Sequence, residues 1–476
     1  MTDIVIALPE LWVALMACAV LLACVLGRDP ETPYLLSQVT LAVALLLVLW
    51  LYPGEPELAF NEMFVNDRMA TVLKAVILAV TAGVFVYSRT YLAARALFNG
   101  EYFVLGLFAV LGMLILVSAH SLLTIYLGLE LLSLSLYAMV AMHRDSHAAS
   151  EAAMKYFVLG ALASGMMLYG ISILYGVTGT LDLQQLAATL QDAERSLLPV
   201  FGLVFLIVGI AFKLGAVPFH MWIPDVYEGA PTSVTLFLTT APKLSGFALA
   251  MRLLVEGLPG LSADWQQMLA VLAVLSMGTG NIVAIAQSNI KRMLAYSTIA
   301  HMGFMLLGLL AATQAGYAGS MFYVIVYALM GMGAFGMVIA LGRAGFESDR
   351  LEDFKGLSER SPWLALLMLM LIFSLAGVPP FVGFWAKWFV IKEALAAGFV
   401  SLAVIAVVFS IIGAYYYLRI VKLMYFDDPE DTSPVVCGQD TRAVLSFNGL
   451  AVLALGLMPG VLMTLCLAAM SGASSS

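Results

Sequence analysis

One glutamate and three lysines lie within long apolar stretches of this sequence: Glu130 in IYLGLELLSLSLY, Lys213 in VFLIVGIAFKLGAV, Lys243 in FLTTAPKLSGFAL and Lys387 in FVGFWAKWFV. An ionisable side chain at the centre of a membrane span costs about 2.5–3.5 kcal/mol, so each of them needs a partner or a function. A lysine removed from water can exchange its proton near neutral pH, whereas an arginine stays charged. A nearby carboxylate favours the charged lysine, and its withdrawal releases the proton. This set of residues therefore indicates proton transfer.

Two further residues could extend the set, Lys155 near the start of an apolar stretch and His301 in TIAHMGF. A histidine in a span can equally serve as a hydrogen-bonded packing residue. For a lysine near the end of a span, the alternative is an ammonium that reaches the membrane interface. We expect this for Lys74, Lys392 and Lys422. For Glu130, the alternative is a static buried ion pair with one of the lysines.

The composition of the chain places these residues in a membrane protein. Hydrophobic residues make up 62% of the sequence and charged residues only 11%, whereas soluble domains are about one quarter charged. The formal net charge of −8 argues against nucleic-acid binding, which needs a basic surface. The four cysteines form no CxxC pair and have no metal-ligand spacing, so neither a metal site nor a disulfide is expected. The first twenty residues lack the Lys or Arg of a secretory signal and are expected to form the first span.

About 20 apolar residues are needed to cross the hydrocarbon core. This length predicts about fourteen spans, near 5–26, 34–52, 69–88, 103–118, 120–142, 153–176, 198–217, 232–254, 265–286, 296–312, 317–341, 362–395, 400–422 and 445–470. The odd-numbered connections carry most of the basic residues, which are Arg28, Arg89, Arg95, Arg144, Lys291, Arg292, Arg343, Arg350, Lys355, Arg360 and Arg442. The even-numbered connections hold little beyond Arg68 and Arg195. Because basic loops favour the cytoplasm, both termini are predicted to be periplasmic.

Two stretches do not fit single straight helices. The apolar stretch 362–395 would be about 51 Å long as one helix, too long for one span. The stretch 213–231 is interrupted by several Gly and Pro residues. Backbone freed by such breaks is tolerated at membrane depth only inside the protein or along a wet cavity.

The two predicted breaks resemble each other. Gly215 and Pro218 precede a phenylalanine and a tryptophan, as do Gly377, Pro379 and Pro380. The breaks are five spans apart, so the second copy would run through the membrane in the opposite direction. Such inverted repeats with broken helices are typical of transporters, although GxPF strings can also arise by chance in a glycine-rich chain.

The predicted fold is therefore an all-α polytopic membrane protein with two inverted five-helix repeats, each containing a broken helix. We expect N-terminal transmembrane helices over 1–102 and a first repeat over 103–254. A second, inverted repeat is expected over 265–424, and a cytoplasmic loop with a C-terminal helix over 425–476.

Three strings carry a family resemblance: KLGAVPFHMWIPDVYEGAPT at 213–232, KRMLAYSTIAHMGF at 291–304 and GVPPFVGFWAKWFV at 377–390. They resemble the antiporter-like membrane subunits of respiratory complex I, the NADH:quinone oxidoreductase, and among these most closely the N-type subunits. The resemblance covers essentially the whole chain. It implies a proton-translocating subunit of a bacterial inner-membrane enzyme, coupled to quinone reduction elsewhere in the complex and without redox catalysis of its own.

The resemblance also implies roles and partners. Glu130 would pair with Lys213, Lys243 would be the central lysine, and Lys387 would face the next half-channel. No cofactor is expected in this chain, since FMN and iron–sulfur clusters belong to partner subunits. M-type and K-type membrane subunits would be its neighbours in the lipid bilayer.

Two alternatives remain open at this stage. A subunit of a multi-subunit cation/proton antiporter or of a membrane-bound hydrogenase would share the fold and the buried Lys/Glu row. A structural membrane scaffold would use its buried charges only to hold helices together.

Overall fold

The computed structural model of the protein describes residues 3–27, 29, 31–192, 196–342, 346–430, 435 and 437–471. Three basic residues used to predict orientation, Arg28, Arg195 and Arg343, lie outside these ranges.

The N-terminal part and the first repeat contain α1 (Asp3–Ile6), α2 (Leu8–Leu26), α3 (Glu31–Trp50), β1 (Glu57–Ala59), β2 (Phe64–Asn66), α4 (Arg68–Ala94), α5 (Gly100–Val117), α6 (Leu122–Val140), α7 (His147–Thr178), α8 (Leu183–Asp192), α9 (Leu197–Leu214), α10 (Trp222–Gly229), α11 (Thr232–Thr239), α12 (Ala241–Ala250) and the π-helix η1 (Met251–Glu256). The remainder contains the 3-10 helix η2 (Pro259–Leu261), α13 (Ser262–Ile285), α14 (Ile290–Leu310), α15 (Gln314–Leu341), the 3-10 helix η3 (Leu351–Phe354), α16 (Leu357–Arg360), α17 (Pro362–Ala376), α18 (Val382–Ala396), α19 (Val400–Phe426), α20 (Gln439–Leu457) and α21 (Pro459–Met470).

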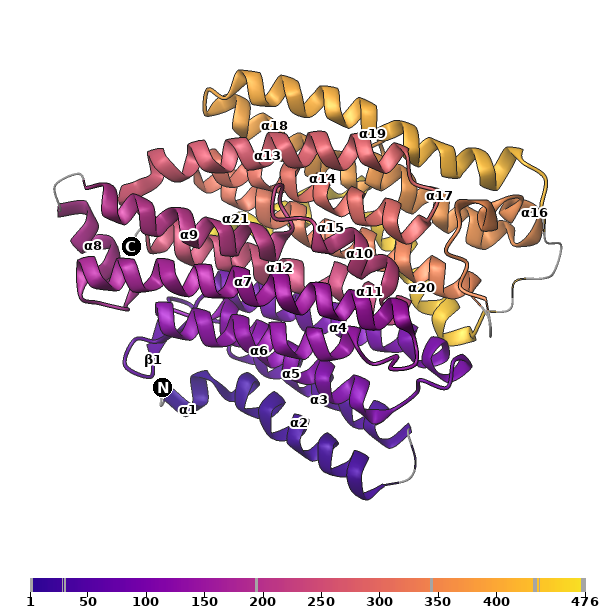
Figure 1. Ribbon diagram of the computed structural model, residues 1–476, viewed down its shortest axis with the longest axis horizontal. Coiled ribbons are helices and arrows are strands. Elements are labelled where there is room, and N and C mark those ends of the chain that lie inside the picture. Colours follow the sequence, from indigo (N-terminus) through magenta and orange to yellow (C-terminus); the bar gives the residue numbers. More distant parts are fainter. Residues whose placement is uncertain are drawn as a thin grey trace.

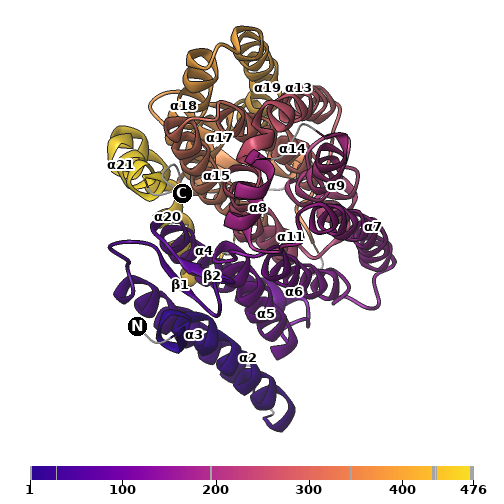
Figure 2. The same cartoon turned by 90° about the vertical axis from the view of Figure 1, so that its left-hand side faces the viewer.

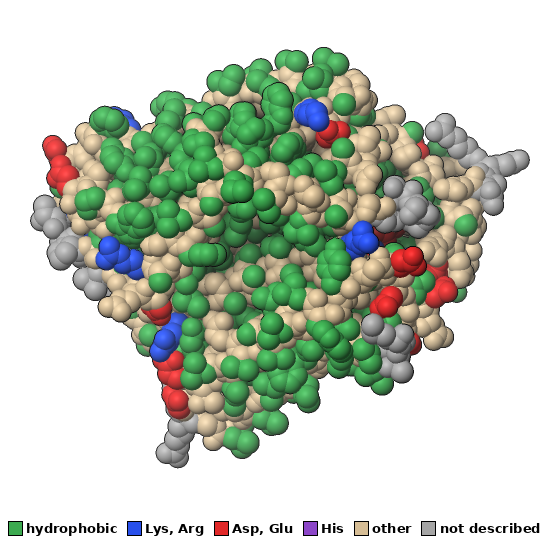
Figure 3. All heavy atoms as spheres, turned by 180° about the vertical axis from the view of Figure 1, so that it is seen from behind, with side chains coloured by type: hydrophobic (Ala, Val, Ile, Leu, Met, Phe, Trp, Pro, Cys, Tyr) green, Lys and Arg blue, Asp and Glu red, His purple; other side chains and the backbone are tan. Residues whose placement is uncertain are grey.

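The long helices lie roughly side by side, and both termini are at the same end of the molecule (Figure 1). Among the described residues, 13 helices are long and apolar enough to cross a membrane. The shorter apolar helices α17 and α18 join across a break to give one more, which agrees with the predicted fourteen. On the face shown in Figure 3, hydrophobic side chains cover much of the middle of the molecule, and most charged side chains gather towards its two ends. The predicted all-α polytopic fold is confirmed.

The two repeats follow each other in the same order of elements. Helices α5, α6, α7, α9 with α10, and α11 with α12 correspond to α13, α14, α15, α17 with α18, and α19. The chain runs away from the terminal end through α9 and towards it through α17, so the repeats are inverted (Figure 1).

Each repeat begins with two helices packed through glycine. A Cβ at Gly112 of α5 would lie 2.5 Å from the backbone nitrogen of Leu132, and one at Gly280 of α13 would lie 2.6 Å from that of Ala300. Small residues let membrane helices approach this closely. The central helices α11, α12, α14 and α15 are almost completely buried.

Three features differ from the predicted spans. The short helix α8 lies at the end of the molecule that holds both termini (Figure 2), and β1 pairs with β2 as a small antiparallel hairpin. The predicted last span, 445–470, is divided into α20 and α21. Pro459 opens α21, and because proline cannot donate the backbone hydrogen bond that would continue α20, the helix breaks there.

Candidate functional site

The first broken helix ends at Gly215. This residue adopts a left-handed conformation with φ of 81°, which favours glycine, and its N–H donates to the carbonyl of Ala211. The chain becomes helical again at Trp222. Lys243, from the neighbouring helix α12, donates from Nζ to the Leu214 carbonyl at 2.9 Å. Its ammonium therefore lies against the negative end of the α9 dipole.

The second break repeats this arrangement with one difference. Gly377 has φ of 86° and donates from its N–H to the carbonyl of Phe373. Lys387 donates from Nζ to the Ala376 carbonyl at 2.8 Å and to Ser410 Oγ of α19 at 3.0 Å. In both breaks a lysine ammonium contacts the last carbonyl before the glycine. At the second break, however, the lysine belongs to α18, the other half of the same broken helix.

Lys213 and Glu130 face the same part of the first repeat but do not touch. Lys213 donates from Nζ to Ser133 Oγ at 3.3 Å, and Ser164 donates its hydroxyl to Glu130. No Lys213–Glu130 ion pair within 4.0 Å is present among the described residues, so the expected direct pair is wrong. A cavity of about 20 Å³ is lined by Lys213, by Ser133 and by Ser164, the serine that donates to Glu130.

The three lysines form a buried row. Lys213, Lys243 and Lys387 are 7%, 1% and 8% exposed. Within the described parts of the chain, none of them has a carboxylate within 4.0 Å. Their hydrogen-bond partners are backbone carbonyls and serine hydroxyls.

His301 lies in the second repeat, between two tyrosines. Its Nδ1 is 2.7 Å from Tyr323 Oη, and its Nε2 is 3.1 Å from Tyr417 Oη. The Tyr417 hydroxyl also lies 2.5 Å from Ser297 Oγ. His301 is thus part of a buried hydroxyl network rather than an isolated packing residue.

The structure does not bring Lys155 into this row. Its side chain is 43% exposed, and its Nζ lies 2.9 Å from Glu151 and 2.7 Å from Asp225. Asp225 also accepts a hydrogen bond from Arg292 at 2.8 Å. Lys155 is therefore part of a partly exposed ion-pair cluster on α7, α10 and α14.

Two other buried cations, Lys74 and Arg252, are paired with carboxylates. Lys74 Nζ lies 2.6 Å from Glu10 Oε1, and both side chains are buried, so the expectation that Lys74 reaches the interface is wrong. Arg252 Nη1 lies 2.7 Å from both Asp67 and Glu256. By contrast, two other lysines placed near span ends, Lys392 and Lys422, have side chains that are 60% and 67% exposed.

Comparisons with known proteins agree with this architecture. The family model described as NADH:quinone oxidoreductase/Mrp antiporter, TM, matches residues 119–413. NADH-quinone oxidoreductase subunit N of Thioalkalivibrio sulfidiphilus is 57% identical and covers 98% of both chains. The subunit N of Thiobacillus denitrificans is 59% identical and covers 97% of this chain and 96% of the relative.

Solved structures show the same fold. A chain of respiratory complex I from Thermus thermophilus has a TM-score of 0.83 at 34% identity, covering 96% of this chain and 98% of that one. A chain of the Mrp complex from Dietzia sp. has a TM-score of 0.88 at 22% identity, covering 100% and 98%, which shows a shared fold alone. Since relatives share more than half of its residues over almost the whole length, the chain belongs to the family of NADH-quinone oxidoreductase subunit N, among the antiporter-like membrane subunits.

Proposed function

We propose that this chain translocates protons as a membrane subunit of a bacterial NADH:quinone oxidoreductase. The observation that carries the proposal is the row of Lys213, Lys243 and Lys387, three buried ammonium groups that have no carboxylate partner in the described part of the chain. A permanently charged lysine in this setting is costly and gives little stability. A lysine that alternates between charged and neutral forms needs such an environment, because a tight ion pair would hold it in the charged form.

The geometry suggests how the relay works. Glu130 interacts electrostatically with Lys213, and the cavity of about 20 Å³ lined by Ser164 and Lys213 is large enough for one water molecule. A proton can pass between Glu130 and Lys213 through this water. The carbonyls of Leu214 and Ala376 then stabilise the ammonium of Lys243 and Lys387 while each holds the proton, since helix C-termini favour positive charge.

We further propose that the redox chemistry takes place in partner subunits, which would hold FMN and the iron–sulfur clusters. The described residues contain no group of three or more His, Cys, Asp or Glu side chains suited to a metal ion. The string GMGAFG at 331–336 has the spacing of a dinucleotide-binding loop. It lies, however, inside the buried helix α15, where Cβ atoms at its glycines would contact side chains of neighbouring helices.

The same proposal places the chain in the inner membrane with both termini in the periplasm and with M-type and K-type subunits as neighbours. Support comes from the family, from the shared terminal end in Figure 1 and from the distribution of basic residues. The solved Mrp complex shares the fold, so the fold does not separate this proposal from a cation/proton antiporter. The 57% identity to a subunit N favours the oxidoreductase.

The test is proton pumping by the assembled enzyme in vesicles, driven by NADH oxidation, for Lys213→Arg, Lys243→Arg and the matching Ala variants. A proton carrier fails with Arg nearly as badly as with Ala, because guanidinium keeps its proton. A scaffold needs only the positive charge and tolerates Arg. Glu130→Gln is also expected to impair pumping.

The control is Lys392→Arg, which changes an exposed lysine of α18 and should leave pumping intact. The amount of assembled complex is measured separately for every variant. Near-normal pumping by both Arg variants would contradict the proton-relay role of the lysines and would support a purely structural role for their charge.

A further inference from the structure

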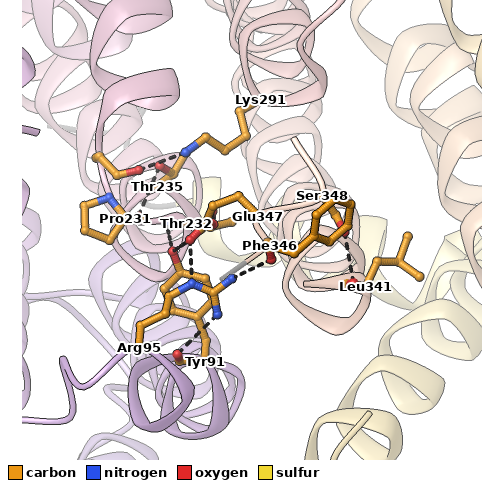
Figure 4. Close-up of polar contacts among 11 residues, drawn as sticks. Tyr91, Arg95, Pro231, Thr232, Thr235, Lys291, Leu341, Phe346, Glu347 and Ser348 are labelled. Atoms are coloured by element: carbon orange, nitrogen blue, oxygen red, sulfur yellow. Dashed lines mark hydrogen bonds and ion pairs between the residues drawn. The ribbon is translucent and has the colours of Figure 1, made fainter. Parts of the chain in front are cut away.

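A second polar system joins the surface of the molecule to the buried lysines. It begins at Glu347, in the connection that follows α15, whose side chain is 43% exposed. Its carboxylate accepts hydrogen bonds from Arg95 Nε at 2.5 Å, from Tyr91 Oη at 3.1 Å and from Thr232 Oγ1 at 3.2 Å. Figure 4 shows these contacts, with Lys291 on the neighbouring helix. Glu347 thus connects an exposed position to the first residue of the fully buried helix α11.

Helix α11 carries a stripe of threonines. Thr232, Thr235 and Thr239 are spaced by three and four residues, which places them on one helix face, and all three are 0% exposed. Thr235 donates its hydroxyl to the Tyr227 carbonyl at 3.0 Å, whereas Thr232 and Thr239 contact polar side chains at the two ends of the stripe. Lys243, which is 1% exposed, lies in the next helix, α12, beyond the non-helical residue Thr240.

The inner end of the stripe is a cluster of three hydroxyls. Tyr327 donates to Thr298 Oγ1 at 2.7 Å, and Thr239 Oγ1 lies 3.3 Å from Tyr327 Oη and 3.5 Å from Thr298 Oγ1. The ring centroid of Tyr327 is 5.2 Å from that of His301. The cluster therefore lies between the first repeat, with Lys243, and the second, with His301.

Tyr227 extends the cluster towards Lys243. Its hydroxyl is buried and has no hydrogen-bond partner among the described residues, and its ring centroid is 6.3 Å from that of Trp222. Lys243 Nζ lies 5.3 Å from the centroid of the same Trp222 ring. Tyr227 and Lys243 thus both lie beside the Trp222 ring.

We propose that Glu347 takes up protons at the end of the molecule opposite the termini, and that the threonine stripe of α11 delivers them through Thr239, Tyr327 and Thr298 to Lys243 and His301. The inference rests on the proposed proton relay. Glu347 alternates between a carboxylate paired with Arg95 and a carboxylic acid released from that pair. Each hydroxyl accepts one proton and gives up another, so its own state is unchanged after the transfer. Water molecules bridge successive threonines, which are about 5–6 Å apart on a helix.

Charged side chains surround Glu347. Arg95 neutralises the carboxylate on one side, and the buried Lys291, which donates to the Ala230 carbonyl at 2.9 Å, adds positive charge nearby. Glu228 and Asp349 also interact electrostatically with Lys291. The alternative is a static latch, in which Glu347 only holds α4, α11 and its own connection together.

The first experiment tests whether the Thr239 hydroxyl transfers protons or whether the side chain only packs. Thr239→Val keeps the shape of the side chain but removes the hydroxyl, and Thr239→Ser keeps the hydroxyl. The assembled enzyme in vesicles should pump about tenfold more slowly with Val than with Ser, because a positioned proton-transfer group accounts for large rate factors. The control is Thr240→Val, since the Thr240 hydroxyl is equally buried but donates only to the Leu236 and Phe237 carbonyls. Equal pumping by Thr239→Val and Thr239→Ser overturns the stripe.

The second experiment tests whether Glu347 takes up protons or only holds neighbouring segments together. Pumping by Glu347→Gln should fall most at alkaline pH, where protons are scarce, and Glu347→Asp should recover part of it. A loss that is the same fraction at every pH overturns the uptake role. Lys243→Arg is measured alongside: if it pumps normally, the relay itself is wrong, whereas failure of Lys243→Arg with normal Thr239→Val rejects only the stripe.

Discussion

Buried cations in two regions of this molecule differ in what surrounds them. Near the end that holds the termini, Lys74 lies 2.6 Å from Glu10, and Arg252 lies 2.7 Å from both Asp67 and Glu256. These charges are neutralised by carboxylates, and breaking such a pair leaves an uncompensated buried charge. They hold helices in place.

In the lysine row, by contrast, the hydrogen bonds of the Lys213, Lys243 and Lys387 ammonium groups to described residues go to carbonyls and hydroxyls. These partners stabilise an ammonium less than a carboxylate does, so the charged form of the lysine is favoured less strongly over its neutral form than in an ion pair. Burial alone therefore does not identify a proton carrier. The three lysines of the row differ from Lys74 and Arg252 in having no carboxylate within 4.0 Å among the described residues, and they also lie at or beside the two helix breaks.

The largest effect on stability is expected for Arg252→Met. The substitution leaves Asp67 and Glu256 as two buried carboxylates without a cation, which costs about 3–5 kcal/mol for a broken buried pair. The yield of assembled complex after purification in mild detergent should fall sharply. Arg68→Met is the control, because Arg68 is less buried and donates to the Gly54 carbonyl. A normal yield for Arg252→Met would contradict a structural role for this pair.

A smaller loss is expected for Lys74→Met, about 3 kcal/mol, because a single carboxylate is left unpaired. Adding Glu10→Gln should restore much of the stability, since it removes the remaining charge. The thermal unfolding midpoint of the purified complex measures both. If the double variant is no more stable than Lys74→Met, the pair does not act as described.

The smallest effect on stability is expected for Lys387→Met. This substitution removes a buried ammonium that has no carboxylate partner among the described residues and replaces it with an unbranched apolar side chain. The unfolding midpoint should stay the same or rise slightly, by less than about 1 kcal/mol in stability, while pumping is lost. A loss of stability as large as that of Lys74→Met would remove the distinction between the two regions.

Local sequence features predicted the parts of the fold that depend on local conformation. The breaks at Gly215 and Gly377 follow from the need for a left-handed residue and from the nearby prolines. The partner of Lys74 could not be predicted in this way, because Glu10 is 64 residues away and the contact depends on how α2 packs against α4.

The site shows the same limit. The sequence identified Lys213 and Glu130 but not the serines that separate them. Ser133 lies one helical turn after Glu130, a spacing visible in the sequence, yet serines are too common for this to stand out. Ser164 comes from another helix. The threonines before Lys243 are likewise regularly spaced, but their alignment with Glu347 depends on tertiary structure.

The origin of the two capping lysines has a mechanical consequence. Lys387 belongs to the same broken helix as the Ala376 carbonyl that it contacts, so the two move together whenever that helix shifts as a unit. Lys243 belongs to α12 and contacts the end of α9, so any sliding of one helix past the other stretches this bond. The Lys243–Leu214 contact therefore responds to displacement between helices, and the Lys387–Ala376 contact keeps its length.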